Sequence, residues 1–97
     1  MKALRDPEHV EFNHLIAACH LPGKNILEIG CGTGVLTRQY AGLAWHAVGI
    51  DPAAADIVQA NKDAHATLSN SSFVRAKGEA LPFPPGSFEV VLFASSL

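Results

Sequence analysis

Apolar positions in the first quarter of the chain recur with the spacing of a helix. They are Phe12, Leu15, Ile16 and Cys19, which follow one another at i, i+3, i+4 and i+7. Asp6, Pro7 and Glu8 are typical of a helix start, because Asp caps free N–H groups and Pro suits the first helical position. Leu21-Pro22-Gly23 then ends the pattern. We therefore expect an N-terminal helix within residues 1–23.

The rest of the chain changes to short, strongly apolar segments separated by loops and helices. The predicted strands are 25–30, 45–50, 73–76 and 88–94, the predicted helices are 35–41 and 53–65, and the predicted loops include 69–72 and 81–87. The first strand is too apolar for a sheet with one solvent-exposed face, which favours a sheet covered on both faces. Alternating strands and helices favour a parallel sheet with right-handed crossovers and helices on both faces. We expect one α/β domain over residues 1–97.

The composition limits the classes of function. The 97 residues carry a formal net charge of −2, with both signs scattered, so neither nucleic acid nor an anionic membrane is expected as the partner. The apolar runs are shorter than the roughly 20 residues that span a bilayer, and no apolar secretory segment opens the chain. Cys19 and Cys31 lack a CxxC partner and are expected to be free thiols, which favours the cytoplasm. The histidines match no metal motif, so no metal is expected.

The last predicted strand raises a question about completeness. It is apolar almost throughout and ends just before Leu97, yet a parallel strand of this kind needs cover on both faces. We therefore expect the sheet to be truncated here, with a missing C-terminal part or a neighbouring chain completing it.

A glycine-rich loop follows the first strand, with Gly30, Gly32 and Gly34 at alternate positions. Glycines let a ligand approach the backbone closely, and ligands of open α/β sheets bind beyond the carboxyl ends of the strands. The spacing G-x-G-x-G lacks the third glycine of the dinucleotide pattern G-x-G-x-x-G. Glu28 lies on the same strand face as Gly30, where a carboxylate repels phosphate. It is suited to a cation such as the ammonium of an amino acid, or to a loop N–H.

Asp51 is the second acidic landmark, at the end of the second predicted strand. The number of residues between the glycine loop and Asp51 is near that at which an acid binds ribose hydroxyls in nucleotide-binding folds. A carboxylate can accept two hydrogen bonds from a vicinal diol. Asp51 followed by Pro52 is equally typical of a helix N-cap. Both roles stay open, and they do not exclude each other.

Three segments together resemble the class I S-adenosylmethionine-dependent methyltransferases, and most closely the group of ubiquinone and menaquinone biosynthesis. The segments are ILEIGCGTG, VGIDP and GEALPFPPGSFEVVLFASSL, and the resemblance covers residues 25–97 and the helix before them. It implies a Rossmann-like sheet of strand order 3-2-1-4, S-adenosyl-L-methionine as cofactor and a small-molecule methyl acceptor.

The resemblance also implies the residues that bind the cofactor. Glu28, Gly30, Cys31, Gly32 and Gly34 would line its methionine part, and Asp51 and Pro52 its ribose and adenosine. Glu79 and Ala80 would flank the adenine with Leu81 packed nearby, and Ala94 and Ser95 would lie beside the sulfonium. Many relatives have an aspartate where this chain has Lys77, so Glu79 stands in as the adenine acceptor. No motif specifies a catalytic residue.

Other interpretations remain open at this point. A nicotinamide-dependent Rossmann oxidoreductase would leave Glu28 unexplained, and a truncated, non-catalytic cofactor-binding piece fits the missing strands. Cys31, Tyr40 and Trp45 are each expected to be packing residues.

Overall fold

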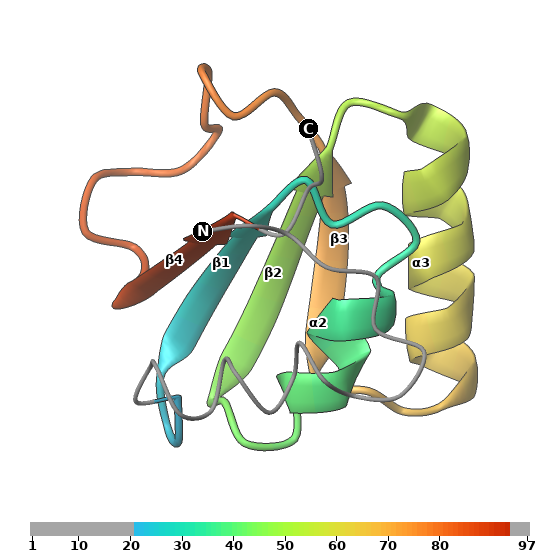
Figure 1. The fold of residues 1–97 in the computed structure, drawn as a ribbon, viewed down its shortest axis with the longest axis horizontal. Helices are drawn as coiled ribbons and strands as arrows, with labels where there is room; N and C mark the ends of the chain where they lie inside the picture. Colours follow the sequence, from blue (N-terminus) through green and yellow to red (C-terminus); the bar gives the residue numbers. More distant parts are fainter. Residues whose placement is uncertain (1–20, 94–97) are drawn as a thin grey trace.

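The structure of the chain, a computed structural model, describes residues 21–93, and Figure 1 shows their arrangement. The strands are β1 (Asn25–Ile29), β2 (His46–Asp51), β3 (Ser71–Arg75) and β4 (Val90–Phe93), and the helices are α2 (Val35–Tyr40) and α3 (Ala54–Ala66). The predicted N-terminal helix within 1–23 and the candidates Ala94 and Ser95 lie largely or wholly outside the described residues.

The four strands form one parallel sheet in the order β3-β2-β1-β4. Glu28 of β1 pairs in register with Gly49 of β2 on one side and with Leu92 of β4 on the other. The predicted parallel sheet with flanking helices and order 3-2-1-4 is therefore confirmed. Because all strands run the same way, their carboxyl ends meet at one edge of the sheet, and the loops that follow β1 and β2 lie together there.

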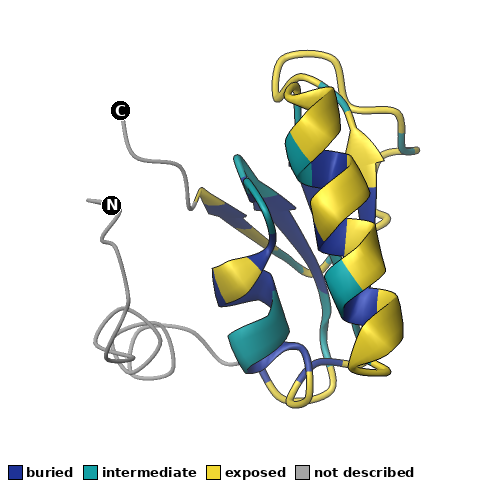
Figure 2. Ribbon diagram, turned by 90° about the vertical axis from the view of Figure 1, so that its right-hand side faces the viewer, coloured by how far each residue is buried: buried dark blue, intermediate teal, exposed yellow. Residues whose placement is uncertain are grey.

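Within residues 21–93, both helices pack on the same face of the sheet. Ala47 belongs to the buried cluster that includes Leu36 and Tyr40 of α2, and Gly49, two residues further along β2, lies against Phe73 in the cluster buried under α3. Residues two apart on a strand share a face. Figure 2 shows the sheet-facing sides of the helices buried, the outer side of α3 mostly exposed and the outer side of α2 mostly of intermediate burial. The expectation of helices on both faces is thus met on one face only in this part of the chain.

The other face of the sheet is only partly covered. Val91 and Phe93 of β4 alternate with the buried Leu92, and they are 47% and 62% exposed. On β1 the same face carries Ile29, whose Cγ2 lies against Gly78 in the long segment between β3 and β4. That segment, drawn in orange in Figure 1, replaces the crossover helix that would otherwise follow β3.

Several predicted boundaries are corrected by the structure, among them the start of β4, which lies at Val90 rather than Phe88. β3 begins at Ser71 rather than Phe73, because the hydroxyls of Ser71 and Ser72 are paired with Ser69 and His46, which lets polar residues start an apolar strand. α3 has Ala53 as its N-cap, with no side-chain cap bond. Asp51 instead ends β2 and accepts the N–H of Ala53, as in an Asx turn.

β3 is an edge strand, and α3 covers part of its open edge. The amide of Asn61 on α3 donates through Nδ2 to the carbonyl of Phe73 at 3.0 Å and accepts the Phe73 N–H through Oδ1 at 3.1 Å. Both backbone groups at the middle of the strand are therefore satisfied by one side chain.

Candidate functional site

The glycine loop is held against the end of β2 by its own backbone. The N–H groups of Gly30 and Cys31 both donate to the carbonyl of Ile50, at 2.9 and 3.0 Å, and the N–H of Gly34 donates to the carbonyl of Cys31 at 2.9 Å. The loop carbonyl of Thr33 accepts from Arg38 Nη1 at 2.7 Å. These bonds fix the loop at the carboxyl ends of β1 and β2, where the switch-point rule expects a ligand.

Asp51 joins the loop to the start of α3. Its Oδ2 accepts the N–H of Gly32 at 3.0 Å, and its Oδ1 accepts the N–H of Ala53 at 2.9 Å. A carboxylate has about four acceptor positions on its two oxygens, and this one is half-buried. Asp51 therefore keeps acceptor capacity on its exposed side while it ties two segments together.

Glu28 lies on the helix face of β1 with no exposed surface. Its Oε1 accepts hydrogen bonds from Thr37 Oγ1 at 2.9 Å and from Tyr40 OH at 2.7 Å, both on α2. Glu28 thus binds the helix that follows the glycine loop, beneath the place predicted for the cofactor. Sequence reasoning missed Thr37 and interpreted Tyr40 as packing alone. A buried carboxylate followed by hydroxyls three residues apart on the next helix was the available signal.

Tyr40→Phe should lower the free energy of unfolding by about 2 kcal/mol at neutral pH, because it removes a hydrogen bond to a buried carboxylate. Burial, together with the neighbouring Glu28 charge, raises the pKa of Tyr40 well above its ordinary value of 10.0. Above pH 10 the unfolded tyrosine ionises while the folded one stays neutral, so wild-type stability falls there. Urea denaturation from pH 7 to 11 should show that the free energy of unfolding falls less steeply with pH in the variant than in the wild type. The same dependence on pH in both proteins would contradict this role of Tyr40.

Cys31 fills space beneath the loop. It is buried in one cluster with Ile57, Ala60 and Phe73. Burial, with smaller contributions from the charges of Glu28 and Asp51, raises the pKa of its thiol from 9.0 to about 12. A thiol that stays neutral at physiological pH is a poor nucleophile, which supports the packing role. Trp45, by contrast, is 72% exposed, so its expected packing role is wrong.

Phe73 of β3 forms the floor under the loop. Gly34 has φ +80°, and a Cβ placed on it would lie 2.6 Å from Phe73 Cζ. A Cβ on Gly49 would lie 2.7 Å from Phe73 Cδ1 and 2.8 Å from Cys31 Sγ. No side chain fits at either glycine without displacing the ring or the thiol.

The third predicted segment reaches the same edge of the sheet. The N–H of Ala76 donates to the carbonyl of Asp51 at 3.2 Å, and the N–H of Ala80 closes a turn on the carbonyl of Lys77 at 3.1 Å. Glu79, Ala80 and Leu81 are exposed in this turn, as is Pro52, whose carbonyl accepts from Arg75 Nε at 3.0 Å. The structure therefore brings the loop, the Asp51 turn and the start of this segment together.

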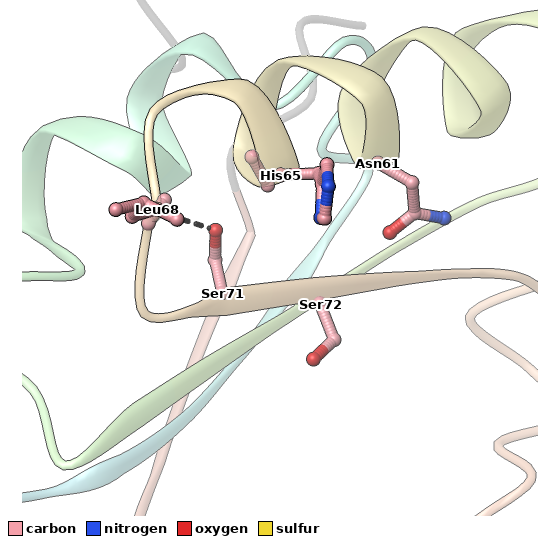
Figure 3. A pocket seen from close by; sticks show the side chains of 7 residues that line it. Asn61, His65, Leu68, Ser71 and Ser72 are labelled. Carbon is pink, nitrogen blue, oxygen red and sulfur yellow. Dashed lines mark hydrogen bonds between the residues drawn. The ribbon is translucent and has the colours of Figure 1, made fainter.

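A surface hollow lies elsewhere, between the end of α3 and the start of β3 (Figure 3). Its lining includes Asn61, His65, Leu68 and Ser71, and none of the predicted cofactor residues. Among residues 21–93, no group of three or more His, Cys, Asp or Glu side chains could hold a metal ion. The same residues include no helix long and apolar enough to cross a membrane.

Residues 26–97 match a family model described as "Methyltransferase domain". The chain belongs to this methyltransferase family. Among its relatives is the ubiquinone biosynthesis O-methyltransferase of Burkholderia thailandensis, which is 37% identical over 93 residues, and the alignment covers 93% of the chain and 39% of the relative. The corresponding enzyme of Paraburkholderia xenovorans is 31% identical over 91 residues, with the same two coverages.

Solved structures, two of them of named methyltransferases, share the fold. A dimethyladenosine transferase from Plasmodium falciparum superposes with a TM-score of 0.78 at 27% identity, over 94% of this chain and 32% of that one. An S-adenosylmethionine-dependent methyltransferase from Mesorhizobium loti gives 0.71 at 25% identity, over 86% and 38%. The YcgJ protein of Bacillus subtilis gives 0.82 at 23% identity, over 89% and 38%. The family model and the relatives above 30% identity place the chain in the class I S-adenosylmethionine-dependent methyltransferase family. The chain spans about two fifths of the length of the curated relatives it matches.

Proposed function

We propose that this chain forms the S-adenosyl-L-methionine-binding half of a methyltransferase that acts on a small molecule. The observation that carries the proposal is the bond between Asp51 Oδ2 and the N–H of Gly32, at 3.0 Å. It joins the acid expected to bind ribose to the loop expected to bind the methionine part, so that one ligand can touch both.

The hydrogen bonds of the loop argue against a pyrophosphate ligand. A phosphate site needs backbone N–H groups that point at the ligand, whereas the N–H groups of Gly30, Cys31, Gly32 and Gly34 all donate within the protein. The nearby carboxylates of Glu28 and Asp51 also disfavour an anion. A ligand with a positively charged amino-acid end fits this environment better than the pyrophosphate of a nicotinamide dinucleotide.

The described candidates outside the glycine loop each have a proposed part. Asp51 accepts the ribose hydroxyls with its remaining acceptor positions, Pro52 lies against the adenosine, and Glu79, Ala80 and Leu81 bound the adenine. Glu28 keeps α2 and the glycine loop in place through Thr37 and Tyr40, so that its effect on the ammonium passes through the loop. When bound, the cofactor supplies a methyl group on a positively charged sulfur, and the chain contributes orientation.

We propose a small molecule as the methyl acceptor, because the relatives are named ubiquinone biosynthesis O-methyltransferases. Further strands of the sheet, or a second chain, would complete the part of the site that binds the methyl acceptor. The exposed Val91 and Phe93 on the uncovered face of β4 support such a completion. A cytoplasmic location is proposed as well, and the free, buried thiol of Cys31 fits a reducing compartment.

Calorimetric titration of the 97-residue chain with S-adenosylhomocysteine tests the binding half directly. We expect saturable heat and a matching rise in melting temperature, since a ligand at a hundred times its Kd stabilises the folded state by about 2.7 kcal/mol. NAD⁺ is the matched control and should give neither. No heat at millimolar S-adenosylhomocysteine would refute the proposal for this chain, and heat with NAD⁺ alone would favour the oxidoreductase. Binding of S-adenosylhomocysteine without methyl transfer from S-adenosyl-L-methionine would identify a non-catalytic cofactor-binding piece.

A further inference from the structure

Three polar side chains form a hydrogen-bonded chain at the amino-terminal end of the sheet, which is the end opposite the glycine loop. Asn70 anchors it, because its Nδ2 donates to the carbonyl of Ala44 at 3.2 Å and also to the carbonyl of Trp45. These two acceptors fix the orientation of the amide, so its Oδ1 is the atom that faces His46. The distance from Asn70 Oδ1 to His46 Nδ1 is 3.0 Å.

The orientation of Asn70 determines the tautomer of the neutral His46 ring. An amide oxygen only accepts, so Nδ1 must carry the proton and Nε2 must present its lone pair. Ser72 Oγ lies 2.8 Å from Nε2, and its hydroxyl therefore donates to that lone pair. A hydroxyl, a base within hydrogen-bond reach and a third group that orients the base are the signature of an activated nucleophile.

This cluster is separate from the candidate cofactor site, and of its three residues only Ser72 also lines the hollow under α3. His46 opens β2 and Ser72 stands near the start of β3, whereas the glycine loop and Asp51 follow the strand ends. Figure 3 shows the hydroxyl of Ser72 pointing away from α3 and His65, while Ser71 points toward the helix. Ser72 and His46 thus meet on the face of the sheet that the two described helices leave uncovered, and both are partly exposed.

We propose that Ser72 is a nucleophile that accepts an acyl group from small activated esters, with His46 as its general base and Asn70 as a positioning residue. Ser72 Oγ forms a bond to the carbonyl carbon while its proton passes to His46 Nε2. The bond between that carbon and the leaving oxygen then breaks, and the leaving alcohol or phenol takes the proton from Nε2. Because the orienting group is a neutral amide rather than a carboxylate, it stabilises the imidazolium weakly. This restricts the reaction to esters with good leaving groups.

The experiment is acetylation of the purified chain by p-nitrophenyl acetate, followed by release of p-nitrophenol and by peptide mass spectrometry. We expect one acetyl group on Ser72. Ser72→Ala should abolish it, and the neighbouring Ser71→Ala, whose hydroxyl pairs with Ser69 on the other face, should leave it intact. His46→Gln should slow the reaction about 100-fold, the usual scale of general-base catalysis, and His65→Gln on α3 should not.

Several results would overturn the proposal. They are an acetyl group found only on lysines or on Ser71, an unchanged rate in His46→Gln, and no acetylation of the wild-type chain. The site mapped on the wild-type chain decides the matter even if the Ser72 or His46 variant fails to fold, and the thermal melt of each variant identifies that case.

Discussion

Asp51→Ala should weaken the binding of S-adenosylhomocysteine roughly 100-fold. The substitution removes the acceptors proposed for the ribose hydroxyls, and hydrogen bonds to a charged group contribute about 1.5–3 kcal/mol each. It also releases Gly32 and Ala53, whose N–H groups the carboxylate holds at 3.0 and 2.9 Å, so the loop must be ordered when the ligand binds. Titration calorimetry at 25 °C measures the change, where a factor of 100 corresponds to about 2.7 kcal/mol.

Asp56→Ala is the matched control for this variant. Asp56 lies in the first turn of α3, so the substitution removes the same charge from the same region without touching the glycine loop. Its affinity should stay within about threefold of wild type, the size of an exposed charge effect. If Asp51→Ala bound as tightly as wild type but melted at a lower temperature, Asp51 would only join the loop to the turn.

Gly34→Ala should be the most destabilising single methyl addition in the described part of the chain, by about 3 kcal/mol. At φ +80° a residue with a Cβ costs roughly 1–2 kcal/mol, and the new Cβ would lie 2.6 Å from Phe73 Cζ. Displacing a packed ring adds roughly 1–3 kcal/mol of overpacking. Urea denaturation of both proteins gives the difference directly.

Gly32→Ala separates the two causes. Gly32 also has a positive φ, +57°, but a Cβ there would meet nothing within 4 Å. Gly32→Ala should therefore lower the free energy of unfolding only by the cost of the positive φ, about 1 kcal/mol. Phe73→Leu should recover part of the loss in a double variant with Gly34→Ala, because it removes the ring atoms that clash. Equal losses for the two glycine variants would show that Phe73 does not limit the space above it.

Much of the sheet could be predicted because the apolar segments and glycines that form its strands and loops are recognisable from neighbouring residues in the sequence. The apolar segment that became β1 and the alternate glycines indicated a covered strand and a ligand loop, and the structure keeps both. The serines at 71 and 72 misled the prediction for β3, because their polarity is balanced by partners distant in sequence, such as His46. Such partners are fixed by tertiary packing and leave no local signal.

Within residues 21–93, both helices lie on one face of the sheet for a geometric reason. Steps from β1 to β2 and from β2 to β3 move in the same direction across the sheet, and right-handed crossovers in one direction place both helices on one face. The connection from β3 to β4 runs back across the sheet in the opposite direction, so a helix in it would cover the other face. In this chain that connection is a loop. The candidate site was predicted in outline, whereas the bonds of Glu28 to Thr37 and Tyr40 depended on how α2 packs.

The Asn61 amide has a consequence for how copies of this protein behave in concentrated solution. An uncovered strand edge invites another chain to add its own strand and so begin an aggregate. At the centre of β3 the two groups needed for that addition already bind Asn61, so an incoming strand would first have to displace the amide. A single side chain on α3 thereby opposes intermolecular strand addition at one border of the sheet.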